Sequence, residues 1–442
     1  MARLFGTDGV RGVAGTELSA DLAFRLGRAA VVVLGRHGEG RPTFLIGRDT
    51  RESGEWLEDS LVEGIRSGGG DAIIGGVQPT PAIAFLTTAL GASSGVVISA
   101  SHNPAEYNGI KFFSRDGMKL SDDLEDEIEA TLDADAASEP GALRSLGEAQ
   151  DRYVEHLVGS AEASLDGMTV VVDCANGAAF ALSPEVLRRL GATVHAINDT
   201  PDGRNINDGC GALHPEVVAA EVVRLGADGG VAHDGDADRA LFADASGNVI
   251  DGDQILAACA ISMQREGRLE EDTVVTTVMS NLGFLRAMKD HGIEVIATKV
   301  GDRYVLEEML RSGAVLGGEQ SGHVIFRERA TTGDGILTAV RFLSLAAKDR
   351  LPLSQLAARM RRFPQVLRNV HVRDREDLEG ARRVWEAVSA AKAELGDAGR
   401  VLVRASGTEP LVRVMVEAES DDLAARHADA IAGVVGTALR RS

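Results

Sequence analysis

The chain has 442 residues and a formal net charge of -21, because 67 aspartates and glutamates outnumber 46 lysines and arginines. This length is too great for one hydrophobic core, so three or four domains are expected. The negative charge repels polyphosphate backbones, so we expect no nucleic-acid partner. A phosphorylated small molecule would need a local site rich in arginine and lysine.

The three cysteines, Cys174, Cys210 and Cys259, form no CxxC pair. This spacing argues against a disulfide framework or a zinc site and fits a reducing compartment. The first residues lack the long apolar region of a signal peptide, and no run reaches the ~18 apolar residues that a membrane span needs. We therefore expect a soluble, cytoplasmic protein without a membrane partner.

The predicted elements repeat one order along most of the chain: strand, polar loop, helix, glycine, strand. The three repeats begin with the apolar runs at residues 43–46, 169–172 and 274–275. This order is typical of parallel βαβ units, so we expect three related α/β domains with mixed, largely parallel sheets. Chance similarity among α/β units is the alternative. Ligands of such sheets bind at the carboxyl ends of strands, in the clefts between domains.

The chain after Phe363 and Pro364 has a different pattern. It predicts a strand at 370–372, a helix near 380–394, strands at 400–404 and 411–417, and a final helix from about 421. We expect a C-terminal α+β domain with a hairpin at its middle. The predicted domains are residues 1–155, 156–253, 254–366 and 367–442.

Residues 98–104, ISASHNP, follow the β-branched run at 96–98. Pro104 prevents a simple helical continuation, so Ser101 is expected in a loop at the end of a stiff strand. Serine is a poor nucleophile unless another group activates it. An ordinary turn containing Asn and Pro is the alternative.

Asp234, Asp236 and Asp238 alternate with small residues. On an extended chain their carboxylates would lie ~6–7 Å apart, so the backbone must curl to bring them onto one cation. Gly235 and Ala237 permit such a curl. Oxygen-only ligands favour magnesium over zinc. A solvated acidic turn is the alternative.

Two further loops have the composition of ligand-binding segments. Arg404–Pro410 contains Gly407, which allows consecutive backbone N–H groups to converge on a phosphate. Arg404 and Arg413 could add charge-assisted hydrogen bonds, although a hairpin turn with exposed arginines explains the same sequence. In the loop at 317–323, Glu319 and Ser321 could bind sugar hydroxyls or an amine, whereas a lone histidine such as His323 is usually structural.

Five motifs together resemble the α-D-phosphohexomutase superfamily. They occupy residues 5–12 (FGTDGVRG), 99–104, 234–239, 318–323 and 404–410, in the family's order and over nearly the whole chain. FGTDGVRG, Gln320 and RASGTEP are most similar to bacterial members that act on glucosamine phosphates. Members that act on glucose or mannose phosphates more often carry Met where Gln320 stands.

The resemblance implies four domains around one cleft, the last of them TBP-like. It implies an isomerase, an intramolecular phosphotransferase, that interconverts glucosamine 6-phosphate and glucosamine 1-phosphate through a glucosamine 1,6-bisphosphate intermediate. The phosphosugar and the bisphosphate are then the partners, a homodimer is allowed, and the product enters UDP-N-acetylglucosamine and peptidoglycan precursor synthesis.

The resemblance also implies residue roles. Ser101 would be phosphorylated, which activity requires, and one Mg²⁺ would bind to this phosphoserine and to the three aspartates. Lys111 and His323 would be general acid/base candidates with Arg11 beside them, and Arg239 would steady the phosphoserine. A surface lysine is the alternative for Lys111. The implied substrate contacts are Glu319, Ser321, Lys299, Gly301, Arg404, Ser406, Gly407, Thr408 and Arg413.

Three other functions fit the same sequence. The nearest is a phosphoglucomutase or phosphomannomutase of the same superfamily. A non-catalytic phosphosugar sensor would not need both Ser101 and the carboxylate trio, and both are present. A phosphatase would release phosphate to water instead of returning it to the sugar.

Overall fold

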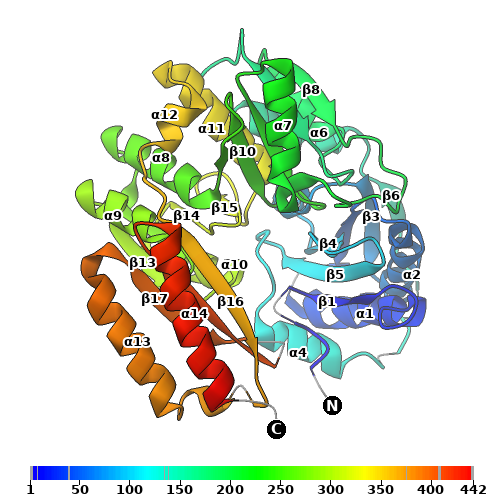
Figure 1. Cartoon of the computed structure of the whole chain (residues 1–442). Helices are drawn as coiled ribbons and strands as arrows, with labels where there is room; N and C mark the ends of the chain where they lie inside the picture. The colour runs from blue at the N-terminus through cyan, green and yellow to red at the C-terminus, as the bar shows by residue number, and fades with distance from the viewer. Residues whose placement is uncertain are drawn as a thin grey trace. The chain divides into compact units, whose positions relative to one another are not determined.

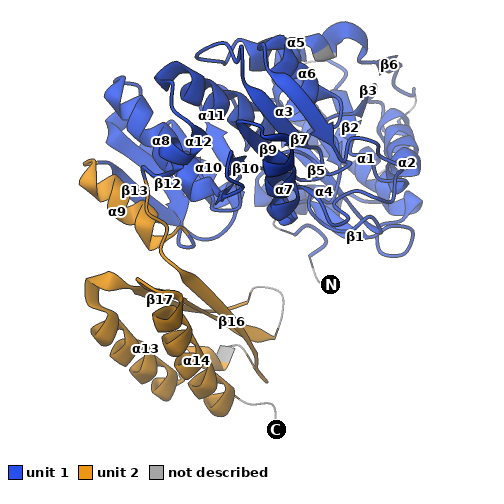
Figure 2. Ribbon diagram, turned by 45° about the horizontal axis from the view of Figure 1, so that its top comes forward, with its two compact units in different colours: residues 1–279, 293–359 blue, residues 280–292, 360–442 orange. Residues whose placement is uncertain are grey.

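The computed structural model describes residues 3–6, 8–37, 40–133, 135–137, 139–374, 376–406 and 410–439. The chain forms two compact units (Figure 2). Unit 1 comprises Met1–Met279 and Ile293–Arg359, and unit 2 comprises Ser280–Gly292 and Met360–Ser442. Unit 1 contains three α/β sheets, and unit 2 contains one smaller antiparallel sheet (Figure 1).

The first sheet of unit 1 has the strand order β1-β5-β4-β2-β3-β6. Its strands are β1 (Val10–Val13), β2 (Thr43–Arg48), β3 (Asp71–Val77), β4 (Ser94–Ile98), β5 (Tyr107–Ser114) and β6 (Leu143–Ser145). The β4-β2-β3-β6 part is parallel, and β5 and β1 are antiparallel additions at one edge. The helices are α1 (Ala20–Leu34), α2 (Ser53–Ser67), α3 (Thr80–Leu90), α4 (Asp122–Ala130) and α5 (Asp151–Val158). Apolar side chains of α1 and α2 share one core with those of β2 and β4, which fixes the strand end from which the Ser101 loop emerges.

The second sheet has the order β11-β10-β9-β7-β8. Its strands are β7 (Thr169–Asp173), β8 (Thr193–Ile197), β9 (Gly229–His233), β10 (Ala240–Asp244) and β11 (Val249–Ile250), with α6 (Leu182–Arg189) and α7 (Pro215–Leu225). The apolar run of β7 is parallel to β8 and β9, whereas β9 and β10 are antiparallel and pair His233 with Ala240. The acidic residues 234–239 are therefore the short connection between β9 and β10.

The third sheet has the order β13-β12-β14-β15. Its strands are β12 (Thr273–Thr277), β13 (Glu294–Thr298), β14 (Leu316–Gly318) and β15 (Val324–Phe326), with α8 (Gly252–Arg265), α10 (Asp302–Ser312), α11 (Gly335–Asp349) and α12 (Leu353–Ala357). Asp251 begins α8 with a capping box to Gln254. Residues 319–323 connect the antiparallel pair β14 and β15.

Unit 2 contains the antiparallel sheet β16-β18-β17. Its elements are α9 (Leu282–Asp290), β16 (Gln365–His371), α13 (Arg382–Leu395), β17 (Arg400–Ala405), β18 (Leu411–Glu417) and α14 (Asp421–Ala438). Helices α13 and α14 share one core with the valines of β17 and β18. Buried Glu417 also holds α9, because it accepts hydrogen bonds from Asn281 Nδ2 and Leu282 N, both at 3.1 Å.

The predicted mixture of parallel-containing α/β sheets with a C-terminal α+β domain is confirmed, whereas the four exact domain boundaries stay a prediction. Ser53 lies in the first turn of α2, where its hydroxyl accepts a hydrogen bond from Asn108 Nδ2 at 2.9 Å. Within the described residues, we find no helix that is long and apolar enough to span a membrane.

Candidate active site

The Ser101 loop begins directly after β4 and places a buried hydroxyl beside a carboxylate. Ser101 Oγ donates to Asp234 Oδ2 at 2.8 Å and lies 3.3 Å from His102 Nδ1. Ser101 has a φ of +52°, in the left-handed region that serine rarely adopts. This conformation turns the hydroxyl toward the β9–β10 connection.

The β9–β10 connection brings the three predicted metal ligands together. Ala237 has a φ of +56°, which supplies the curl that the alternating sequence requires. Asp234, Asp236 and Asp238 are all buried, and each offers a carboxylate oxygen within 4.8 Å of the others. Gly335 at the start of α11 donates its N–H to Ala237 O at 2.9 Å and holds the curl from behind.

The three carboxyl groups have different electrostatic surroundings. Burial, and then the neighbouring carboxylates, raise the pKa values of Asp234 and Asp238. Burial opposes ionisation of Asp236 too, but the Lys111 ammonium and the Thr80 hydroxyl, which donates at 2.6 Å, lower its pKa. Asp236 Oδ1 and Asp238 Oδ1 are buried without a hydrogen-bond partner. The trio thus has unsatisfied hard oxygen donors and suggests a metal cofactor.

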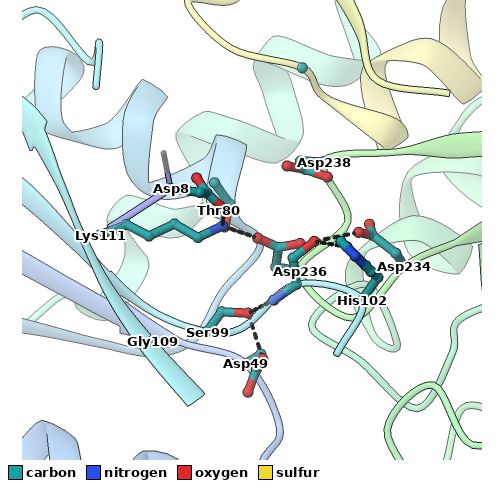
Figure 3. Close-up of polar contacts among 12 residues, drawn as sticks. Asp8, Asp49, Thr80, Ser99, His102, Gly109, Lys111, Asp234, Asp236 and Asp238 are labelled. Carbon is teal, nitrogen blue, oxygen red and sulfur yellow. Dashed lines mark hydrogen bonds and ion pairs between the residues drawn. The ribbon is translucent and has the colours of Figure 1, made fainter. Parts of the chain in front are cut away.

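Lys111 lies on β5 with only 2% of its side chain exposed, so the alternative of a surface lysine is wrong. Its Nζ is 3.0 Å from Asp236 Oδ2 and 3.0 Å from Asp8 Oδ2 (Figure 3). Burial lowers the pKa of Lys111, but the two carboxylates outweigh burial and raise it overall. Asp8 also pairs with Arg11 and Lys119, so three cations converge on one carboxylate.

His323 lies on the opposite side of the same ion-pair network. Its Nε2 accepts a hydrogen bond from Gly333 N at 3.2 Å and is 3.6 Å from Asp302 Oδ2. Lys119 is 2.6 Å from Asp302. Asp8, Lys119 and Asp302 therefore join Lys111 to His323, whose Nδ1 is buried without a hydrogen-bond partner.

A cavity of ≈ 420 Å³ in unit 1 contacts several predicted site residues, namely Arg11, Ser101, Arg239, Gly301, Glu319 and His323. Gly301 N donates to Glu319 Oε1 at 3.1 Å, so these two predicted substrate contacts adjoin each other. Lys299 does not line the cavity, and its Nζ lies 6.0 Å from the Tyr304 ring centroid. Ser321 does not line it either, although its Oγ is buried without a hydrogen-bond partner.

The remaining predicted contacts belong to unit 2. Arg404 on β17 pairs directly with Arg413 on β18, so two cations share one face of the hairpin. Burial, and then the charge of Arg413, lower the pKa of Arg404, which favours a bound anion. Ser406 is buried, and its N–H donates to Leu411 O at 2.9 Å. Gly407 and Thr408 lie outside the described residues.

The sequence alone did not assign roles to Asp8, His102, Lys119 or Asp302. Asp8 and His102 lie inside recognised motifs, so the motifs themselves were the available signal. Burial, followed by the charges of Arg239 and Arg11, lowers the pKa of His102 to about 4. No recognised motif contains Lys119 or Asp302. These two residues are 183 positions apart in the sequence, and only the fold brings them together.

Four sequence models of phosphoglucomutase/phosphomannomutase domains match the chain. The alpha/beta/alpha domains I, II and III match residues 2–139, 151–247 and 251–363, and the C-terminal domain matches residues 367–434. Together they cover almost the full length.

Individual relatives are similar over the same length. A phosphoglucosamine mutase of Symbiobacterium thermophilum is 55% identical over 100% of both chains, and one of Frankia casuarinae is 53% identical over 99% of both. A phosphoglucomutase/phosphomannomutase family protein of Burkholderia thailandensis has a TM-score of 0.82 at 27% identity, over 99% of this chain and 97% of its own. An Aspergillus fumigatus N-acetylphosphoglucosamine mutase, solved with GlcNAc-6P and magnesium, has a TM-score of 0.68 at 18% identity, over 98% of this chain and 96% of its own.

Proposed function

The chain belongs to the phosphoglucomutase/phosphomannomutase family, and on that premise we propose that it acts as a phosphoglucosamine mutase. This isomerase interconverts glucosamine 6-phosphate and glucosamine 1-phosphate through a phosphoserine and glucosamine 1,6-bisphosphate. The observation that carries the proposal is the buried Ser101 hydroxyl, 2.8 Å from Asp234 in a carboxylate trio with two unpartnered oxygens.

Ser101 is the phosphorylated residue in this proposal, and activity requires its phosphate. Asp234, Asp236 and Asp238 would hold one Mg²⁺ together with the Ser101 phosphate, because hard oxygen ligands suit this ion. When bound, the ion would supply positive charge that neutralises the phosphate and favours departure of the serine oxygen. Arg239 and Arg11, which both line the cavity, bind the phosphate oxygens.

Lys111 and His323 handle protons on the two sides of the reacting phosphoryl group. The attacking sugar hydroxyl must lose a proton, and the departing serine oxygen must gain one. The Lys111 ammonium adjoins the carboxylate trio, and His323 Nδ1 has no hydrogen-bond partner that would compete with substrate. Asp8 orients Lys111 through their ion pair, and Asp302, which Lys119 holds at 2.6 Å, orients His323 from 3.6 Å.

The substrate has two ends that need different recognition. Glu319, Ser321, Gly301 and Lys299 bind the sugar hydroxyls and the amino group. The hairpin containing Arg404, Ser406, Gly407, Thr408 and Arg413 binds the remote phosphate. This hairpin must accept the bisphosphate in both orientations, because either phosphate has to reach Ser101 in turn.

Glucosamine phosphates are favoured over neutral hexose phosphates by the full-length relatives at 52–55% identity, which carry the name phosphoglucosamine mutase. The product then feeds UDP-N-acetylglucosamine synthesis and peptidoglycan precursors in the cytoplasm. A homodimer is compatible with this role. A phosphoglucomutase or phosphomannomutase activity is the second candidate, because the Burkholderia thailandensis family protein shares the fold with a TM-score of 0.82.

The proposal is tested by ³¹P NMR of the purified chain with Mg²⁺ and a trace of glucosamine 1,6-bisphosphate. Glucosamine 6-phosphate should be converted faster than glucose 6-phosphate or mannose 6-phosphate. EDTA and Ser101→Ala should each abolish conversion, and intact mass spectrometry should locate one phosphate on Ser101. Faster turnover of a neutral hexose phosphate would favour the second candidate, whereas free phosphate as the main product would indicate a phosphatase. No conversion and no phosphate on Ser101 would indicate a sensor.

A further inference from the structure

One buried arginine donates hydrogen bonds to several backbone carbonyl oxygens in and after the Ser101 loop. Arg51 follows β2 and is fully buried. Its guanidinium donates to Ser101 O at 3.0 Å, to Asn103 O at 2.8 Å and to Tyr107 O at 3.0 Å, and it also contacts Pro104 O. A buried guanidinium must satisfy its donors, and here four loop carbonyls do so.

The other side of Ser101 is held through the same arginine. Ser101 N donates to Ser99 Oγ at 2.9 Å. Ser99 Oγ in turn donates to Asp49 Oδ2 at 2.6 Å (Figure 3). Arg51 Nε donates to Asp49 Oδ2 at 2.9 Å. The peptide groups before and after Ser101 are therefore fixed by one buried ion pair between Asp49 and Arg51.

A second donor reaches the loop from the region of the second sheet. Asn207 lies between β8 and α7, and its Nδ2 donates to Ser101 O at 2.9 Å and to Asn103 O at 3.2 Å. Its own N–H donates to Ala175 O at 2.9 Å, which ties it to the segment that follows β7. Ser101 O thus accepts hydrogen bonds from Arg51, which follows β2 of the first sheet, and from Asn207, which follows β8 of the second sheet.

These contacts share one property. Around Ser101 they use only backbone N–H and carbonyl groups and the Ser99 hydroxyl. None of them uses Ser101 Oγ, which is the atom that carries the phosphate in the proposed function. A left-handed serine is strained, and such a conformation persists only where surrounding contacts enforce it. Contacts that do not involve Ser101 Oγ can enforce this left-handed conformation equally in the unphosphorylated and the phosphorylated enzyme.

We propose that Asp49, Arg51 and Asn207 are positioning residues that hold Ser101 Oγ on the carboxylate trio through both halves of the reaction. This inference rests on the proposed function of Ser101. We call the three residues the Ser101 brace. None of the three lines the cavity or belongs to the carboxylate trio, and they act only by fixing the conformation of the nucleophile.

Asn207 gives the cleaner test, because truncating it removes two donors without removing a charge. Asn207→Ala should lower kcat about 10- to 100-fold, the factor expected for one or two lost hydrogen bonds. KM for glucosamine 6-phosphate and the Tm should stay close to those of the parent enzyme. Asn207→Asp should be slower still, because a carboxylate of the same shape cannot donate to the two carbonyls.

Arg51 provides a second test by chemical rescue. Arg51→Ala should be far slower than Asn207→Ala, and added guanidinium at non-denaturing concentration should restore part of its kcat, whereas methylammonium should not. If Arg51→Ala does not fold, the Asn207 variants still decide. Arg204→Ala is the matched control, because Arg204 is an exposed neighbour whose ion pair with Glu52 connects the same two parts of the chain. Its kcat should equal that of the parent.

A parent-like kcat for Asn207→Ala, or a loss confined to KM or shared by Arg204→Ala, would overturn the brace. A single-turnover experiment separates this result from failure of the proposed function. Parent enzyme phosphorylated on Ser101 should transfer its phosphate to glucosamine 6-phosphate, and Asn207→Ala should do so about 10- to 100-fold more slowly. A parent enzyme that carries no phosphate and converts no sugar phosphate would refute the proposed function itself.

Discussion

Replacing Asp334 by asparagine is expected to stabilise unit 1 at neutral pH. Asp334 is buried at the start of α11, where it accepts hydrogen bonds from Leu337 N at 2.8 Å and from the Tyr153 hydroxyl at 2.9 Å. Burial raises its pKa from the ordinary 3.8 to about 6, although both hydrogen bonds oppose the rise. An amide of the same shape can accept from Leu337 N and donate to Tyr153, and it carries no charge.

The expected size follows from the shift in pKa. A pKa that is higher in the folded state than in the unfolded state means that protonation of this carboxyl stabilises the fold. This stability is fully present below about pH 3.8 and is lost as the pH rises through about 6. Relative to the fully protonated form, a pKa shift of about two units lowers the free energy of unfolding of the parent by about 3 kcal/mol above pH 7. At pH 4.5 the same shift lowers it by about 1 kcal/mol. The asparagine variant does not ionise, so its advantage over the parent should grow by about 2 kcal/mol between these two pH values.

Differential scanning calorimetry of parent and Asp334→Asn at pH 4.5 and pH 7.5 measures this difference. A change of about 2 kcal/mol corresponds to about 3 °C in Tm for a unit of this size. Asp133→Asn is the control, because the Asp133 side chain is 93% exposed and its loss should give no such pH dependence. A Tm difference between Asp334→Asn and parent that is the same at both pH values would refute the reasoning.

Three further predictions concern the candidate site. Lys111→Met removes the cation that lies 3.0 Å from both Asp8 and Asp236, and it should lower kcat at least about 100-fold. Its Tm should also fall, because breaking a buried ion pair costs about 3–5 kcal/mol of folding free energy. A parent-like kcat would contradict the acid/base role. Asp238→Asn should raise the Mg²⁺ concentration for half-maximal activity about 10- to 100-fold, measured by metal titration after EDTA treatment; an unchanged titration would remove Asp238 from the ligand set. Arg413→Ala should raise KM for glucosamine 6-phosphate far more than it lowers phosphate occupancy of Ser101 by mass spectrometry, and Arg426→Ala, an exposed arginine of unit 2, is its control.

Local patterns predicted the parallel sheets and the acidic loop because each depends on neighbouring residues. Fully buried parallel strands such as β4 and β7 are continuous apolar runs, and the polar residues that follow them mark their carboxyl ends. The curl at Ala237 follows in the same way from three carboxylates that alternate with small side chains. No long-range information is needed for either prediction.

The ion-pair network could not be predicted from sequence, because its members are isolated charges in unrelated segments. Lys119 and Asp302 look like ordinary surface residues in the sequence, and only the fold of unit 1 brings their charged groups to 2.6 Å from each other. Arg51 is equally hidden, since an arginine in a polar loop normally indicates a solvated side chain. It is buried because four carbonyl oxygens from a later segment accept its hydrogen bonds.

The hydrogen bonds between Glu417 and the start of α9 determine which fragments of the chain are suitable for separate expression. The chain passes between the two units three times, near residues 279, 292 and 359, so no single cut separates them. A fragment that starts at Met360 would lack α9 and would deprive the buried Glu417 carboxylate of its hydrogen bonds from Asn281 and Leu282. An expression fragment for unit 2 should therefore contain residues 280–292 as well as residues 360–442.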